Sequence, residues 1–254
     1  MLLLLTACSP SGPTIAERRA EQEQKYRDQL ATERRTLQAT DSLLAVIIPQ
    51  INTATAKGFE YEKTEYDDLG RFRPQGSDPG QNVQRTYLRS AVDDYGRTQL
   101  IATYCGSKSF VVHQLQFSAS DGSTITTAAI EPNDGSNYSY DIDGTHYQSV
   151  TFSFAGRIAE GMTQNAAAQQ QADTDNGALA FLAEHADDAQ LTCHYLSTQG
   201  KQQRVPLSAT DRQGFAATYE LGLLLRESIR LQQENKTASL KIQYLEERLA
   251  SKQK

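Results

Sequence analysis

Residues 221–249, LGLLLRESIRLQQENKTASLKIQYLEERL, contain the pattern that decides the predicted fold. Apolar side chains recur there at steps of three and four residues, with two polar interruptions at Ser228 and Asn235. The row consists of Leu221, Leu224, Ser228, Leu231, Asn235, Ala238, Ile242, Leu245 and Leu249. This spacing is typical of a heptad helix, and a buried amide such as Asn235 fixes the register of many coiled coils. Ser208 and Asp211 fit a capping box, so we expect a C-terminal stalk helix over residues 208–254.

A second heptad pattern lies near the N-terminus. Thr14 and Glu17 form a capping box, Pro49 should end or kink the helix, and Lys57-Gly58 should stop it. The row runs through Tyr26, Leu30, Glu33, Leu37, Thr40, Leu44, Ile47 and Ile51. We therefore expect an N-terminal stalk helix over residues 14–57 that pairs with residues 208–254 in an antiparallel coiled-coil hairpin within a monomer. An intermolecular coiled coil is the alternative.

Between the two helices, residues 58–207 change to a period of two with hairpin-like turns. Short turn sequences such as Asp94-Tyr95-Gly96 and Asp143-Gly144 separate the segments. The expected strands cover 85–92, 98–105, 109–118, 123–130, 137–142, 146–154 and 189–196. A short helix over 177–185 and a polar excursion at 164–175 complete this β-rich head domain. The predicted fold class is α+β, an antiparallel β sandwich or barrel head inserted between the two long helices.

Charge follows the same boundaries. Residues 58–210 contain 10 Lys and Arg against 19 Asp and Glu. A surface with this excess of acidic groups repels phosphate backbones, so we expect no nucleic-acid partner. A solubilised surface is the simpler interpretation, and an acidic docking face is the other.

No motif with the spacing of a catalytic, metal or phosphate site is present, and we predict no catalytic residues, no metal and no cofactor. The histidines, His113, His146, His185 and His194, are scattered along the chain. Asp141-Ile142-Asp143-Gly144 and Asp173-Thr174-Asp175-Asn176-Gly177 place carboxylates beside glycine, as calcium loops do, but lack the spacing of an EF-hand. Tight turns explain both segments.

Three tyrosines flank the Asp143-Gly144 turn. Tyr138 and Tyr140 share one face of a strand, and Tyr147 follows the turn. Exposed rings would stack on sugar rings or on a partner protein, whereas buried rings would be cross-strand packing, the interpretation that we favour. The sequence therefore gives Tyr138, Tyr140 and Tyr147 as candidate ligand-facing aromatics.

Cys105 and Cys193 both fall in expected strands. In an oxidising compartment they form a disulfide if their Cα atoms lie close together. Otherwise they are two small buried side chains that never meet.

Leu5-Thr6-Ala7-Cys8 follows the apolar run Leu2 to Leu5 and resembles the lipobox of bacterial lipoproteins. The resemblance implies that residues 1–7 are the remnant of a signal peptide and that Cys8 is the lipid attachment site, acylated with chains such as palmitate. Residues 8–13 would form a flexible tether. Neither a basic residue nor a full-length leader precedes the lipobox, which departs from the family pattern. Ser9 after Cys8 favours the outer membrane of a Gram-negative cell envelope by the same resemblance.

Tyr104-Cys105-Gly106 and Thr218-Tyr219-Glu220-Leu221 also resemble uncharacterised lipoproteins of Gram-negative gut bacteria. Our first hypothesis is a lipid-anchored envelope protein with a non-enzymatic binding or scaffolding role toward an envelope protein or glycan. The alternatives are an envelope-polymer hydrolase or metal-dependent enzyme and a structural protein that oligomerises through coiled coils.

Overall fold

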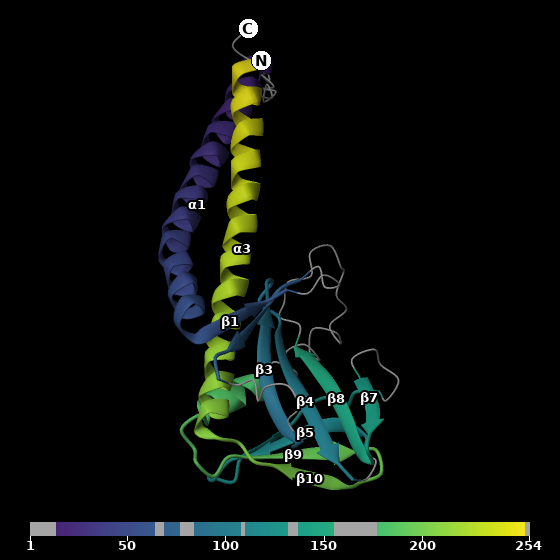
Figure 1. The fold of residues 1–254 in the computed structure, drawn as a ribbon. Helices are drawn as coiled ribbons and strands as arrows, with labels where there is room; N and C mark the ends of the chain where they lie inside the picture. The colour runs from purple at the N-terminus through teal and green to yellow at the C-terminus, as the bar shows by residue number, and fades with distance from the viewer. Residues whose placement is uncertain are drawn as a thin grey trace, which may run out of the picture. The chain divides into compact units, whose positions relative to one another are not determined.

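A computed structural model describes residues 14–63, 69–76, 84–107, 110–131, 137–154 and 177–251 (Figure 1). Its described part contains two long helices, a shorter helix that includes residues 177–184, and two antiparallel sheets. The long helices are α1 (Ile15–Gly58) and α3 (Ala209–Ser251). The strands are β1 (Phe59–Glu62), β2 (Arg71–Pro74), β3 (Tyr87–Asp93), β4 (Thr98–Gly106), β5 (Val112–Ser118), β6 (Thr124–Thr126), β7 (Asn137–Ile142), β8 (Thr145–Phe154), β9 (Thr192–Ser197) and β10 (Gln202–Val205).

Both long helices begin at the predicted capping boxes. Thr14 N donates to Glu17 Oε2 at 2.6 Å, and Glu17 N donates back to Thr14 Oγ1 at 3.2 Å. At α3, Ser208 N donates to Asp211 Oδ2 at 2.8 Å, and Asp211 N donates to Ser208 Oγ at 3.1 Å. These reciprocal bonds satisfy amide groups that have no partner within the helix. Pro49 does not end the helix, because α1 continues through it to Gly58, the predicted stop.

The larger sheet has six strands in the order β1-β2-β3-β4-β8-β7, with β3 and β4 at its centre (Figure 1). Residues alternate between its two faces. Leu100, Ala102 and Tyr104 of β4 point toward the buried core cluster, as do Val150 and Phe152 of β8. The opposite face of the same strands carries Cys105 and Tyr147, which are direct cross-strand partners.

The smaller sheet has four strands in the order β10-β9-β5-β6 and shares its core with the larger one. Leu115 and Phe117 of β5 lie in that core together with Cys193 and Tyr195 of β9. Tyr195 is fully buried, and its hydroxyl donates a hydrogen bond to the carbonyl oxygen of Tyr87 in the other sheet. This bond ties the two sheets together and satisfies a polar group that burial would otherwise destabilise.

The first turns of α3 complete the same core. Phe215 belongs to the main apolar cluster, and Leu221 packs with Phe59 and Val92 in a second cluster. Between them, the buried hydroxyls of Ser90 and Thr218 share a hydrogen bond of 2.7 Å. The N-terminal half of α3 is therefore a structural part of the β-rich unit.

The chain forms two compact units whose boundaries lie inside the long helices. One consists of residues 1–46 and 231–254, and the other of residues 47–230. The predicted fold, a sandwich or barrel head inserted between two long heptad helices that form an antiparallel coiled-coil hairpin, is wrong. Within the described residues, three helices accompany two antiparallel sheets, and residues 209–230 use the start of the heptad row to pack on the sheets.

The composition of the heptad row in α1 adds a second reason. Among the residues of α1, only Thr40 is fully buried, whereas a coiled-coil seam requires buried apolar side chains at successive positions. Leu231, Ala238 and Leu245 of α3 are buried in this unit, and polar contacts also link its helical segments. Arg34 pairs with Glu246 at 2.7 Å, Lys241 pairs with Glu33 at 2.9 Å, and Asn235 Nδ2 donates to Asp41 Oδ1.

Candidate functional site

The predicted lipid attachment site, Cys8, lies outside the described residues together with the rest of residues 1–13. The lipid anchor therefore stays a prediction. Within the described part of the chain, no helix is sufficiently long and apolar to cross a bilayer. The second acidic segment singled out above, Asp173 to Gly177, and the excursion at 164–175 also lie largely or wholly outside the described residues.

The candidate tyrosines come together on the hairpin of β7 and β8. Tyr140 and Tyr147 are direct cross-strand partners, and their rings stack with centroids 5.0 Å apart and an interplanar angle of 8°. Tyr138 follows on the same face, 5.4 Å from the ring of Tyr140. Tyr138 is 66% exposed and Tyr140 is 41% exposed, so these rings are not core packing, contrary to the interpretation that we favoured. The three side chains form an aromatic surface at the rim of the larger sheet, called the tyrosine surface below.

The turn that joins the two strands explains why the rings align. Asp143 and Gly144 both have positive φ, 49° and 75°, as a type I′ turn requires. This turn matches the right-handed twist of the strands and gives an unbroken register from Ile142↔Thr145 to Asn137↔Val150. Asp141-Ile142-Asp143-Gly144 is thus a hairpin turn, as predicted, and Asp143-Gly144 supplies the two positive φ angles of the turn.

Polar side chains support the other face of this hairpin. Asp141 Oδ1 lies 2.9 Å from His146 Nδ1, and Gln148 Nε2 donates to Asn137 Oδ1 at 2.9 Å. The buried Gln148 also accepts a bond of 2.7 Å from the backbone amide of Val112 in the smaller sheet. These contacts hold β7 and β8 in place, so the tyrosines stand on a fixed hairpin.

The hydroxyl of Tyr147 has an altered environment. Desolvation, followed by a hydrogen bond with Cys105, raises the pKa of Tyr147 above its usual value. At neutral pH the phenol is protonated, as an ordinary tyrosine also is, and can donate a hydrogen bond. The tyrosine surface accordingly combines apolar ring faces with a hydrogen-bond donor.

The predicted disulfide between Cys105 and Cys193 is not formed, and both thiols are free. Cys193 points into the core from β9, and burial raises the pKa of its thiol. Cys105 follows Tyr104 on β4 and therefore points to the opposite face of the larger sheet. The alternative, two small side chains that never meet, is the one that the structure has.

His185 takes part in a cluster that the sequence analysis missed. Its Nε2 lies 3.4 Å from Ser123 Oγ and 3.6 Å from Asp121 Oδ2, although these residues are about sixty positions away in the sequence. Ser123 Oγ donates to Asp121 Oδ1 at 2.5 Å, so the hydroxyl proton is directed to the carboxylate and not to the imidazole. His185 Nδ1 lies 2.9 Å from the carbonyl oxygen of Phe181. A serine nucleophile requires a different order, serine to histidine to carboxylate, so we assign this cluster to closing the β5–β6 turn.

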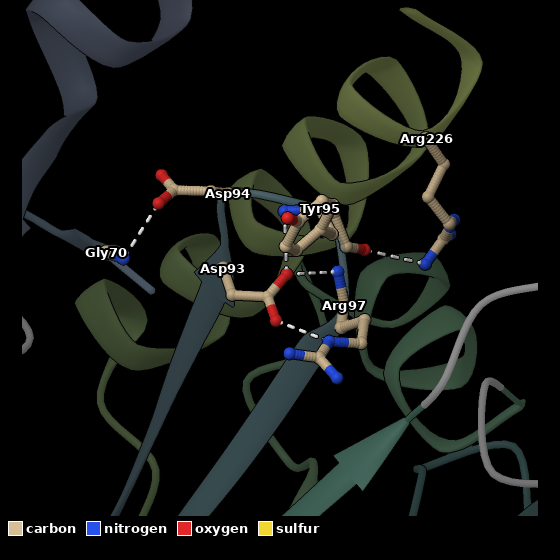
Figure 2. A network of polar contacts seen from close by, with 7 residues as sticks. Gly70, Asp93, Asp94, Tyr95, Arg97 and Arg226 are labelled. Carbon is tan, nitrogen blue, oxygen red and sulfur yellow. Dashed lines mark hydrogen bonds and ion pairs between the residues drawn. The ribbon is translucent and has the colours of Figure 1, made fainter. Parts of the chain in front are cut away.

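The densest polar network surrounds the β3–β4 turn (Figure 2). The side chain of Asp93 is only 2% exposed and accepts bonds from the amides of Tyr95 and Arg97, each at 2.9 Å, and from Arg97 Nε. Asp94 points the other way and accepts a bond of 2.7 Å from Gly70 N. Both carboxylate oxygens of Asp93 and Oδ2 of Asp94 therefore accept hydrogen bonds from the protein itself.

The same turn is also hydrogen-bonded to α3 and packs closely on it. Arg226 Nη1 donates to the carbonyl oxygen of Gly96 at 3.0 Å. A Cβ atom at Gly96 would lie 2.8 Å from both Arg226 Cγ and the carbonyl oxygen of Gly222. This packing leaves no room for a substrate, so we assign the network a structural role.

The other candidate features also lack catalytic chemistry. A hollow of about 410 Å³ between β2 and the start of α3 is lined by eight residues, none of which is ionisable: Gly58, Pro74, Gln75, Ala209, Thr210, Gln213, Gly214 and Ala217. His113 bonds to the carbonyl oxygen of Leu196 at 2.9 Å. Among the described residues, no group of three or more His, Cys, Asp or Glu side chains has the geometry to hold a metal ion.

Comparison of the chain with protein-family models gives no match, and comparison with curated proteins gives no similar sequence.

Proposed function

We propose that this protein is a lipid-anchored protein of the cell envelope that binds a glycan without catalysing a reaction. Cys8 would attach it to the membrane, and the tyrosine surface would bind the ligand. The observation that carries the binding role is the exposure of Tyr138 and Tyr140 in a fixed aromatic row. Large aromatic side chains that a fold leaves in water at one place are typical of interaction sites.

The chemistry of the surface favours sugars. The apolar C–H faces of a pyranose ring pack on aromatic rings, and hydroxyl groups need polar partners at the rim. Asp143, which is exposed in the turn near Tyr147, supplies an acceptor beside the rings. Because this group is acidic, the surface suits neutral or N-acetylated sugars better than anionic ones.

The arrangement of ionisable groups supports binding over hydrolysis. A glycosidase needs two carboxyl groups that face each other across a substrate. In the described residues the buried carboxylate of Asp93 is consumed by the β3–β4 turn, and Asp121 by the β5–β6 turn. Asp93 is buried away from any polymer, and the exposed Asp121 is bonded to Ser123 within its own turn.

Attachment and ligand binding are tested separately. The variant Cys8→Ser, expressed with its native leader in a Gram-negative host, should move from the membrane fraction to the soluble fraction. Continued membrane association would contradict the lipid anchor. Localisation at the outer membrane is checked in the same cells by separating the two membranes on a density gradient.

For ligand binding, the probe is purified peptidoglycan sacculi, which present N-acetylated sugar rings. The Cys8→Ser chain should sediment with sacculi, and the double variant Tyr138→Ala/Tyr140→Ala should lose at least about tenfold in affinity, because stacking on an aromatic ring contributes of the order of 1 kcal/mol per ring. Tyr95→Ala removes a ring that is 52% exposed on the β3–β4 turn and is the matched control. Equal binding of all three proteins, or no binding by the parent, would contradict the proposal.

A further inference from the structure

Strand β7 is the last strand of the larger sheet. It pairs with β8 on one side, and no described strand pairs with its other edge. Its residues from Tyr138 to Ile142 are all exposed. The backbone groups of an edge strand that point away from the sheet are a template for another strand.

The edge lacks the features that usually prevent such pairing. The sequence of β7, NYSYDI, contains no proline and no lysine, and its register with β8 is continuous, without a bulge. A single charge, on Asp141, lies on the face opposite the tyrosines. Among the described residues, the outer edge of β7 is therefore regular, unpaired and uncharged on the face of the tyrosines.

We propose that β7 pairs with β7 of a second copy of this chain, antiparallel and centred on Tyr140. Directly opposite residues of two antiparallel strands lie on the same face, so an even-numbered residue must meet an even-numbered one. Centred on Tyr140, each Tyr138 lies opposite Ile142 of the second copy, and the two Tyr140 rings meet at the two-fold axis. Tyr138 and Ile142 are 66% and 52% exposed, and this pairing covers both of them in both copies.

The charges select the same register. On the other face, Asp141 lies opposite the neutral hydroxyl of Ser139, so no like charges meet. A shift of one step toward the turn would set Asp141 opposite Asp141, which is unfavourable for directly paired carboxylates. A shift the other way would set Asp141 opposite the neutral Asn137 but would leave Ile142 without an opposite residue within β7. Within β7, the register centred on Tyr140 is therefore the one that covers both Tyr138 and Ile142 and sets no like charges opposite each other, and it is symmetric about a two-fold axis.

Pairing would join the two tyrosine surfaces into one continuous aromatic face across a sheet of twice the width. The proposal does not depend on the identity of the ligand. It does predict that a polymer would be held by both copies at once, which raises avidity without any new contact.

The first experiment reverses the charge at Ser139, which is exposed and separate from the tyrosines. Sedimentation equilibrium of the full chain carrying Cys8→Ser, in mild detergent over a range of concentrations, should show a monomer–dimer equilibrium. Ser139→Asp creates two Asp–Asp contacts across the axis and should raise the dissociation constant about tenfold. Ser139→Lys creates two Lys–Asp contacts and should lower or preserve it. A parent that is monomeric at every concentration, or a dimer that ignores both changes, as a helix-mediated oligomer would, overturns the proposal.

The second experiment tests the register. Opposite residues in an antiparallel pair have Cα atoms roughly 4.5–5.5 Å apart, within the range of a disulfide. Tyr140→Cys should therefore form a covalent dimer on mild oxidation. Tyr95→Cys, at an equally exposed site, should form little, and the two native thiols, Cys105 and Cys193, are present in both proteins. Equal cross-linking of the two variants would overturn the register. Ser139→Asp leaves the tyrosines intact, so a dimer that is unchanged by this substitution, together with retained binding to sacculi, would refute self-pairing alone.

Discussion

The β3–β4 and β7–β8 hairpins both turn at a glycine with positive φ, but the surroundings of the two turns differ. Each turns at a glycine with φ of 75°, Gly96 in the first and Gly144 in the second. Around Gly96, Arg226 and Gly222 of α3 close in, whereas no atom lies within 4 Å of a Cβ placed on Gly144. Turn chemistry alone therefore does not separate a structural hairpin from a binding one. The residues around the turn distinguish the two roles. The polar groups of the first hairpin form hydrogen bonds within the fold, whereas the second hairpin leaves its aromatic rings exposed.

The largest expected difference between the two hairpins is steric. Gly96→Ala should destabilise the protein by about 3 kcal/mol, because alanine is unfavourable at this positive φ and its Cβ would overlap α3. Gly144→Ala has the same φ in open space and should cost only about 1 kcal/mol. Urea unfolding of both variants measures the two values. Equal losses would contradict the close packing of the β3–β4 turn on α3.

The carboxylates of the two hairpins should differ next. Asp93→Ala leaves two part-buried amides and Arg97 without their acceptor and should cost about 2 to 3 kcal/mol. Asp141→Ala removes the contact of a carboxylate that is 76% exposed with His146 and should cost less than about 1 kcal/mol. The same unfolding measurement at neutral pH checks both. A larger loss at Asp141 than at Asp93 would reverse the comparison.

A third turn, between β5 and β6, adds a dependence on pH. The hydrogen bond to the carbonyl of Phe181, with further support from Asp121, raises the pKa of His185. A histidine with a raised pKa in the folded state stabilises most fully below its unfolded value of about 6.5, and this stabilisation is lost as the pH rises through the folded pKa. The wild type should therefore lose a little stability relative to His185→Asn between pH 6 and pH 8. Parallel stability curves over that range would show that protonated His185 contributes nothing.

The smallest effect on stability belongs to the tyrosine surface. Tyr138→Ala should change the free energy of unfolding by no more than about 0.5 kcal/mol, since the ring is mostly in water. Its effect on glycan binding should be much larger than this. Thermal unfolding beside the binding measurement separates the two, and a strongly destabilised variant would identify Tyr138 as a packing residue instead.

Local signals in the sequence predicted local structure well. The capping boxes at Thr14 and Ser208 start helices where expected, and Asp143-Gly144 makes the expected hairpin turn. Strand β7 has the predicted bounds, 137–142. These features depend on a few neighbouring residues, so a single sequence contains what is needed to recognise them.

Features that depend on distant partners were missed or wrong. Strands β1, β2 and β10 are only four residues long, too short for periodicity to reveal them. The heptad row of α3 predicted one long coiled coil. The same spacing also suits a helix packed on a sheet, so the pattern alone does not separate the two structures. The exposure of Tyr138 and the meeting of His185 with Asp121 both follow from strand order, which no single-sequence pattern specifies.

Hydrogen–deuterium exchange of the full chain carrying Cys8→Ser, with and without soluble peptidoglycan fragments, tests the central claim most directly. Both hairpins are followed in one experiment, so each is the control for the other. The account predicts slower exchange in residues 137–150 when the glycan is present and unchanged exchange in residues 87–106. Protection confined to residues 87–106, or none in either hairpin, would contradict the assignment of the tyrosine surface as the binding site.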